Sequence, residues 1–252
     1  MAPRLARLPP ALWILVALVA VALTAVLSLL REDIGRSKRS RSLRSVLAKS
    51  QAINRLSAAR FFLFASRDIW FVVALPVFLD EVLGWSFEGI GAFLALWIIG
   101  YGAVQSIAPE LIGATGDETR GARLWAGLLA LITSALAILV SADAALETSV
   151  VVGLVIFGVV FAVNSSLHSY LILAYSEEDD VALDVGFYYG ANAAGRLVGT
   201  LLSGALYLAG DFALAMWGSA AFVAASWLLT FALPATNTIG TATEDPTKFI
   251  AT

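Results

Sequence analysis

Three arginines lie within stretches of sequence that are otherwise strongly apolar, and their position suggests a chemical role. Arg60 and Arg67 occur in SAARFFLFASRDIWFVVALP, and Arg196 occurs in GANAAGRLVGTLLSG. If such stretches cross a membrane, an ionised arginine near the midplane costs about 2.5–3.5 kcal/mol unless a partner, water or an anionic ligand compensates it. The three positions are therefore candidate anion-binding residues.

The spacing of the first two arginines places them on one helix face. Arg60 and Arg67 are seven residues apart, a separation of about 20° around a helix. Arg60 is close to the expected helix start, so its side chain either extends to the membrane surface or binds substrate. Asp68 adjoins Arg67 but is about 100° away around the helix, so the sequence does not establish that it neutralises Arg67.

Arg196 is expected at the middle of its helix, where two stripes of residues run side by side. The small stripe, which would let another helix approach closely, consists of Ala191, Gly195, Gly199 and Ser203. The polar stripe, which would face an aqueous cavity, consists of Asn192, Arg196, Thr200 and Ser203. The alternative is that Arg196 is held in a static core, bonded to backbone carbonyls or paired with Asp68.

Other polar side chains in the apolar stretches could add hydrogen bonds to a ligand. Asn164 and His168 share a face at i and i+4, and we expect His168 to join two helices, with proton relay as the alternative. Tyr101 and Gln105 end an aromatic stripe that begins at Phe93 and is expected to pack against another helix. The candidate substrate-binding residues are Arg60, Arg67, Tyr101, Gln105, Asn164, His168, Asn192 and Arg196.

The composition indicates that these residues are held by membrane-spanning helices. The chain has 252 residues, is 60% hydrophobic and carries charge on only 14% of its positions, too apolar for an ordinary soluble domain. Continuously apolar segments of about 20 residues favour helices over barrel strands. The seven expected spans are 11–30, 57–79, 87–112, 124–142, 148–174, 183–209 and 213–233, with a kink at Pro76. The predicted fold is thus an all-α membrane protein.

The distribution of Lys and Arg predicts the topology. A dense basic block follows the first span, and Arg120 and Arg123 follow the third, whereas the turns near 80–86, 143–147 and 210–212 contain neither residue type. The N-terminus is therefore expected outside and the C-terminus in the cytoplasm. We divide the chain into an N-terminal transmembrane helix (1–31), a basic cytoplasmic linker (32–56), a six-helix transmembrane bundle (57–234) and a polar cytoplasmic tail (235–252).

Several kinds of chemistry are disfavoured. The chain has no cysteine and a single histidine, His168, which excludes disulfides, thiolate metal sites and multi-histidine sites within one chain. Paired acids or a serine with a base do not converge at one depth, so we expect neither an enzyme nor a cofactor or metal.

One helix, a long basic loop and six closely connected helices resemble the second half of a twelve-helix transporter of the major facilitator superfamily. The loop GATGDETRGARLW resembles a degenerate copy of that superfamily's cytoplasmic loop signature, with Asp117, Arg120, Gly121 and Arg123 at the matching positions. Asp117, Arg120 and Arg123 are therefore expected to form a conformational latch, because charges near helix ends each contribute about 0.3–1 kcal/mol.

A narrower resemblance comes from RDIWFVV, FLALW-x-x-GYG and ANAAGRLVGTLLSG. These runs resemble the ArsJ-type organoarsenical efflux permeases, a bacterial branch of the superfamily. Membership implies export of 1-arseno-3-phosphoglycerate across the bacterial inner membrane, a functional link to glyceraldehyde-3-phosphate dehydrogenase, and arsenate resistance. It also implies an N-terminal transporter half as partner.

A different class of function is a non-transporting membrane interaction protein or an inactive transporter remnant. In that reading the arginines bind lipid headgroups or a partner protein.

Overall fold

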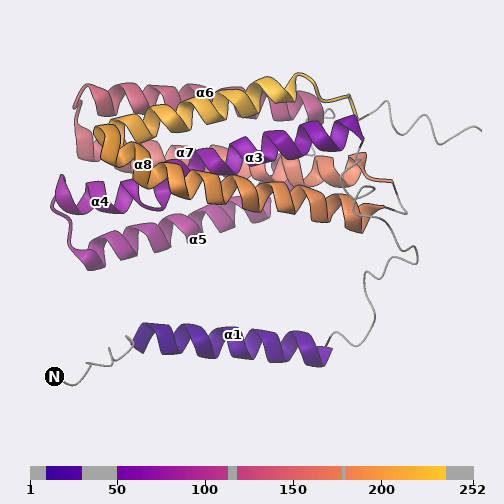
Figure 1. The fold of residues 1–252 in the computed structure, drawn as a ribbon, viewed down its shortest axis with the longest axis horizontal. Helices are drawn as coiled ribbons and strands as arrows, with labels where there is room; N and C mark the ends of the chain where they lie inside the picture. Colours follow the sequence, from indigo (N-terminus) through magenta and orange to yellow (C-terminus); the bar gives the residue numbers. More distant parts are fainter. Residues whose placement is uncertain (1–9, 30–49, 113–117, 178–179, 237–252) are drawn as a thin grey trace, which may run out of the picture. The chain divides into compact units, whose positions relative to one another are not determined.

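The computed structural model describes residues 10–29, 50–112, 118–177 and 180–236, and every regular element within these ranges is an α-helix (Figure 1). The chain divides into two units, residues 1–42 and residues 43–252. Helix α1 belongs to the first unit and the other helices belong to the second. The helices are α1 (Pro10–Leu29), α3 (Gln51–Phe71), α4 (Ala74–Glu81), α5 (Phe87–Ile112), α6 (Glu118–Ser141), α7 (Leu146–Tyr175) and α8 (Val181–Thr230). Most of the predicted linker and tail lies outside the described residues.

Helix α1 is apolar around its whole circumference. Its two hydroxyl side chains, Thr24 and Ser28, bond back to the helix, to the carbonyls of Ala20 at 2.8 Å and Ala25 at 3.0 Å. Because these hydroxyls are satisfied within the helix, the 20-residue segment suits a hydrocarbon environment.

Within its described residues, the second unit contains five helical stretches that are long and apolar enough to span a bilayer. They are α3 together with α4, then α5, α6, α7 and α8. With α1, these helices confirm the predicted all-α fold, and the chain is a multi-pass membrane protein.

The predicted span 57–79 begins earlier than expected, at Gln51, and is broken between α3 and α4. Pro76 lacks an N–H, and its ring would clash with the carbonyl four residues before it, so a continuous helix is disfavoured here. Ser203 of α8 repairs the break, because its hydroxyl accepts hydrogen bonds from the backbone N–H groups of Val73 at 3.2 Å and Ala74 at 3.0 Å. The predicted kink is confirmed.

Helix α8 consists of two helical segments separated by a turn. Gly210 and Asp211 have non-helical dihedrals, and Asp211 is left-handed with φ of 65°. The Asp211 carboxylate accepts a hydrogen bond from the N–H of Ala213 at 2.7 Å and so caps the second segment. The turn lies between the predicted spans 183–209 and 213–233.

The small residues of α8 pack against α3, and the two helices lie side by side in Figure 1. A Cβ atom at Gly195 would collide with the carbonyl oxygen of Phe61, and one at Gly199 would lie 2.5 Å from that of Ala65. The predicted close approach along the small stripe is therefore confirmed, and it brings the backbones of α3 and α8 together near the arginines.

The aromatic stripe of α5 packs on α7, as predicted. Trp97 donates its indole N–H to the carbonyl of Leu154 at 2.8 Å, and the absence of a side chain at Gly158 leaves room for its ring. Tyr101 stacks on Trp97 with ring centroids 5.8 Å apart. This packing holds Tyr101 and Gln105 next to the polar part of α7.

Candidate anion site

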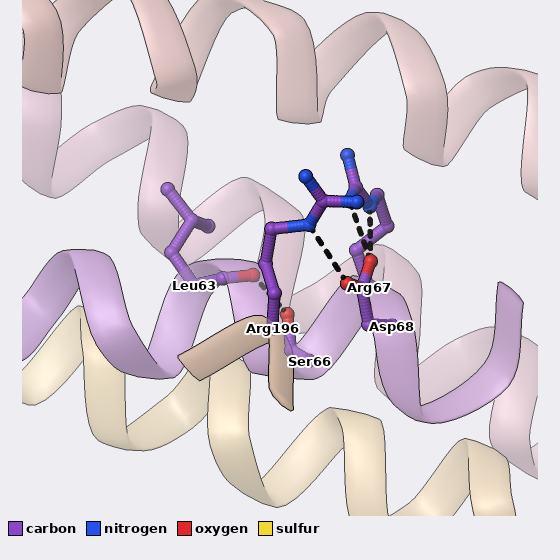
Figure 2. A network of polar contacts seen from close by, with 5 residues as sticks. All are labelled: Leu63, Ser66, Arg67, Asp68 and Arg196. Carbon is purple, nitrogen blue, oxygen red and sulfur yellow. Dashed lines mark hydrogen bonds and ion pairs between the residues drawn. The ribbon is translucent and has the colours of Figure 1, made fainter. Parts of the chain in front are cut away.

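A single carboxylate joins the two arginines that were expected near the midplane. Arg67 donates from Nε and Nη2 to Oδ1 of Asp68, at 2.7 and 2.5 Å, and Arg196 donates from Nε to Oδ2 at 3.1 Å. Figure 2 shows the two guanidinium groups converging on this carboxylate. Helices α3 and α8 are thus linked by a bridged ion pair.

The pairing answers two questions left open by the sequence. Asp68 is separated from Arg67 around the helix, but the long Arg67 side chain folds back and reaches it. Arg196 also pairs with Asp68, as the static-pair alternative required. Because one carboxylate serves two guanidinium groups, the cluster of Arg67, Asp68 and Arg196 retains a net charge of about +1.

The cluster is open on one side. The side chain of Asp68 is 1% exposed and that of Arg67 is 12% exposed, whereas that of Arg196 is 55% exposed. Of the three guanidinium nitrogens of Arg196, only Nε makes a hydrogen bond to another described residue. A charged group so exposed within a spanning helix must face water, a ligand or another protein, because facing lipid is costly.

Arg60 is buried, which rules out the expectation that it extends to the membrane surface. Its side chain is 3% exposed, and Nη1 donates to the carbonyl oxygen of Ser165 at 3.0 Å and to its hydroxyl at 3.1 Å. The guanidinium carbon lies 3.9 Å from the ring centroid of Phe64 and 5.0 Å from that of Tyr188. Cation–π contacts therefore replace water around Arg60.

Ser165 connects Arg60 to α5, because its hydroxyl also contacts Nε2 of Gln105 at 3.2 Å. Tyr101, one turn from Gln105, lies beside Phe161 of α7 with ring centroids 5.8 Å apart. The structure thus brings Arg60, Tyr101 and Gln105 into one region of α3, α5 and α7.

Asn164 and His168 behave differently from each other. Asn164 donates to the carbonyl oxygen of Trp125 in α6 at 2.9 Å and so joins α7 to α6. The hydrogen bond expected for His168 is not present: the ring is fully buried, and within the described residues neither nitrogen has a partner.

The polar stripe of α8 is only partly as predicted. Asn192 and Thr200 are partly buried beside exposed Arg196. Ser203 is wrong as a cavity residue, because it is fully buried and binds the break between α3 and α4. Ser203 was predicted in both the small and the polar stripe, but its side chain can point only one way. The close packing of α8 on α3 directs it toward α3.

Of the predicted latch residues, Arg123 contacts the main chain at the end of α8 and just beyond it. Arg123 donates from Nε to the carbonyl of Thr230 and from Nη2 to that of Leu233, both at 3.2 Å. Arg120 is exposed, and Asp117 lies outside the described residues. Arg123, near the start of α6, therefore binds main-chain carbonyl groups at and just beyond the end of α8, and the conformational latch stays a prediction.

Sequence reasoning missed other residues that hold the same segment. Arg55 of α3 donates to the carbonyl of Ala232 at 2.7 Å, and Tyr175 of α7 donates to that of Pro234 at 2.8 Å. These acceptors are main-chain atoms, which every residue carries, so no side-chain pattern identifies them.

Comparison with known proteins identifies the family but not a specific relative. No curated protein matches the chain. Residues 56–250, most of the chain, match the family model described as Major Facilitator Superfamily. This match, over most of a helical membrane protein, shows that the chain belongs to the Major Facilitator Superfamily.

Proposed function

We propose that this membrane transporter carries an anionic metabolite through an efflux pathway, with Arg67 and Arg196 as the primary binding residues. The observation that carries the proposal is the pair of guanidinium groups sharing one buried carboxylate. Because the cluster is positive and Arg196 is half exposed, an oxyanion can bind without the loss of the existing ion pairs.

The chemistry of guanidinium favours a phosphate-like group. Arginine presents planar, paired N–H donors that match the oxygens of phosphate and carboxylate, and its charge persists at all physiological pH values. Two such groups at the two oxygens of Asp68 form a pre-positioned receptor. This supports the organoarsenical 1-arseno-3-phosphoglycerate as the substrate, in line with the resemblance to ArsJ-type permeases.

The exposed side of Arg196 also supports the proposal of a second helical bundle. In this superfamily fold a substrate site lies between two repeated bundles, which rock around it. An N-terminal half would supply the opposite wall of the site and separate Arg196 from lipid. We place this assembly in the bacterial inner membrane with the C-terminus in the cytoplasm, functionally linked to glyceraldehyde-3-phosphate dehydrogenase.

Arsenate resistance tests the function. Bacterial cells that express the dehydrogenase together with this protein and the proposed N-terminal half should grow at arsenate concentrations that stop cells with the dehydrogenase alone. Arg67→Gln and Arg196→Gln should abolish the gain, whereas Lys248→Gln, which removes one positive charge from the tail, should preserve it. If cells with the unaltered protein gain no arsenate resistance, the proposed substrate is wrong. If cells with either arginine variant keep the resistance, the proposed binding site is wrong.

A further inference from the structure

A second cationic group lies next to the bridged pair on the same face of α3. Arg60 precedes Arg67 by seven residues, which corresponds to about 10 Å along a helix. Both guanidinium groups lie close to the ring of Phe64, with guanidinium carbons 3.9 Å and 5.2 Å from its centroid. The two cationic positions are therefore adjacent and share one aromatic ring.

Arg60 lacks a compensating anion. No carboxylate lies within 4 Å of its guanidinium in the described parts of the chain, and its Nε has no hydrogen-bond partner there. Its contacts are the carbonyl and hydroxyl of Ser165 and the rings of Phe64 and Tyr188, all of which are neutral. A buried charge is costly without a partner of opposite charge, so the site can gain from an anionic ligand.

Helix α8 provides a matching row of polar residues. Tyr188, Asn192 and Arg196 recur at i, i+4 and i+8, which places them on one face. Tyr188 lies against Arg60, and Arg196 shares Asp68 with Arg67. Asn192 falls between these two levels, and its buried Oδ1 has no partner among the described residues. An acceptor that a ligand hydroxyl group would satisfy therefore lies between the levels of the two cationic positions.

We propose that Arg60 is a specificity-determining residue that binds a second anionic group of the substrate. This inference rests on the proposed function of Arg67 and Arg196, which would hold the first anionic group. The preferred ligand is a short hydroxylated molecule with an oxyanion at each end. Its hydroxyl donates to Asn192, and its second oxyanion replaces the missing negative charge at Arg60.

Two phosphate esters of equal length form a matched pair of probes. 3-Phosphoglycerate and glycerol 3-phosphate share the phosphate and the central hydroxyl, and they differ in having a carboxylate or a hydroxymethyl group at the other end. Binding of each to the purified full chain in detergent is measured by titration calorimetry. The protein should bind 3-phosphoglycerate roughly tenfold more tightly, as expected for one additional charge-assisted contact.

The variants assign this preference to a residue. Arg60→Gln should reduce the affinity ratio to about one and leave the affinity for glycerol 3-phosphate unchanged. Arg60→Lys should keep part of the preference, because it keeps the charge but not the planar donor group. Arg196→Gln should weaken both probes alike, since both carry the phosphate.

The outcomes separate this inference from the proposed function. If the unaltered protein binds both probes equally, the role of Arg60 is refuted while the anion site at Arg67 and Arg196 stands. A preference that survives in a folded Arg60→Gln protein refutes it as well. If neither probe binds, the proposed anion site itself is wrong. Because the comparison of the two probes on the unaltered protein is decisive alone, misfolding of a variant does not leave the inference untested.

Discussion

The two ion pairs of Asp68, with Arg67 and with Arg196, should differ in strength, and two double-mutant cycles measure the difference. Asp68 and Arg67 are almost buried and share two short hydrogen bonds, whereas Arg196 is 55% exposed and makes one at 3.1 Å. Removing one partner of a buried pair costs about 3–5 kcal/mol. An exposed pair contributes about 0.2–1 kcal/mol.

One cycle combines Asp68→Asn with Arg67→Gln, and a second combines Asp68→Asn with Arg196→Gln. The change in free energy of unfolding is measured by titrating the protein in mixed micelles with a denaturing detergent while following tryptophan fluorescence. Asp68→Asn should cost about 3 kcal/mol or more, because it leaves Arg67 buried without a counter-charge. Arg196→Gln alone should cost less than about 1 kcal/mol.

The coupling energies carry the test. We expect the coupling of Asp68 with Arg67 to exceed its coupling with Arg196 by at least about 1 kcal/mol, outside the usual error of additivity. Equal couplings, or a stronger coupling with Arg196, would show that exposure does not govern this site. Arg196 would then be a structural partner of Asp68, and its assignment to substrate binding would fail.

Two further substitutions test the surroundings of the site. Gly199→Ala places a methyl group 2.5 Å from the carbonyl of Ala65 and should cost about 1–3 kcal/mol, whereas Gly190→Ala in the same helix meets open space and should be neutral or stabilising; melting temperatures in detergent compare them, and equal melting would contradict the close contact of α3 and α8. Arg123→Gln loses two hydrogen bonds to the end of α8 and should lower stability by about 1–3 kcal/mol. Limited proteolysis should then cleave the segment beyond Thr230 faster than in the unaltered protein, and unchanged cleavage would argue against the latch.

The elements that were predictable from the sequence are those set by local chemistry. Continuous apolar runs require helices in a bilayer, Pro76 cannot continue one, and the spacing of Gly195 and Gly199 produces a face that admits a second backbone. Each feature depends on residues close together in the chain. The helix boundaries were less accurate, since α3 begins at Gln51 instead of near residue 57.

The contacts of the arginines were not predictable in the same way. Arg60 is held by Ser165 and Tyr188, more than one hundred positions away, and the sequence does not reveal that these groups meet. The length of the arginine side chain adds a second uncertainty. Arg67 and Asp68 point in different directions from the helix, yet the Arg67 side chain is long enough to reach Asp68. Main-chain acceptors, such as those bound by Arg123, carry no signature in the sequence at all.

The packing of α3 and α8 explains how two arginines from distant parts of the chain meet at one carboxylate. Gly195 and Gly199 bring the backbones too close for any added side-chain atom, so the helices are expected to shift together as a unit. Ser203 adds hydrogen bonds to the break after α3, which restrains the same pair of helices. We therefore expect Arg67 and Arg196 to keep their relative positions when the bundle moves. Movement during transport should occur between this pair of helices and less tightly packed elements, such as α5, so that access to the proposed site changes while the arrangement of the two arginines does not.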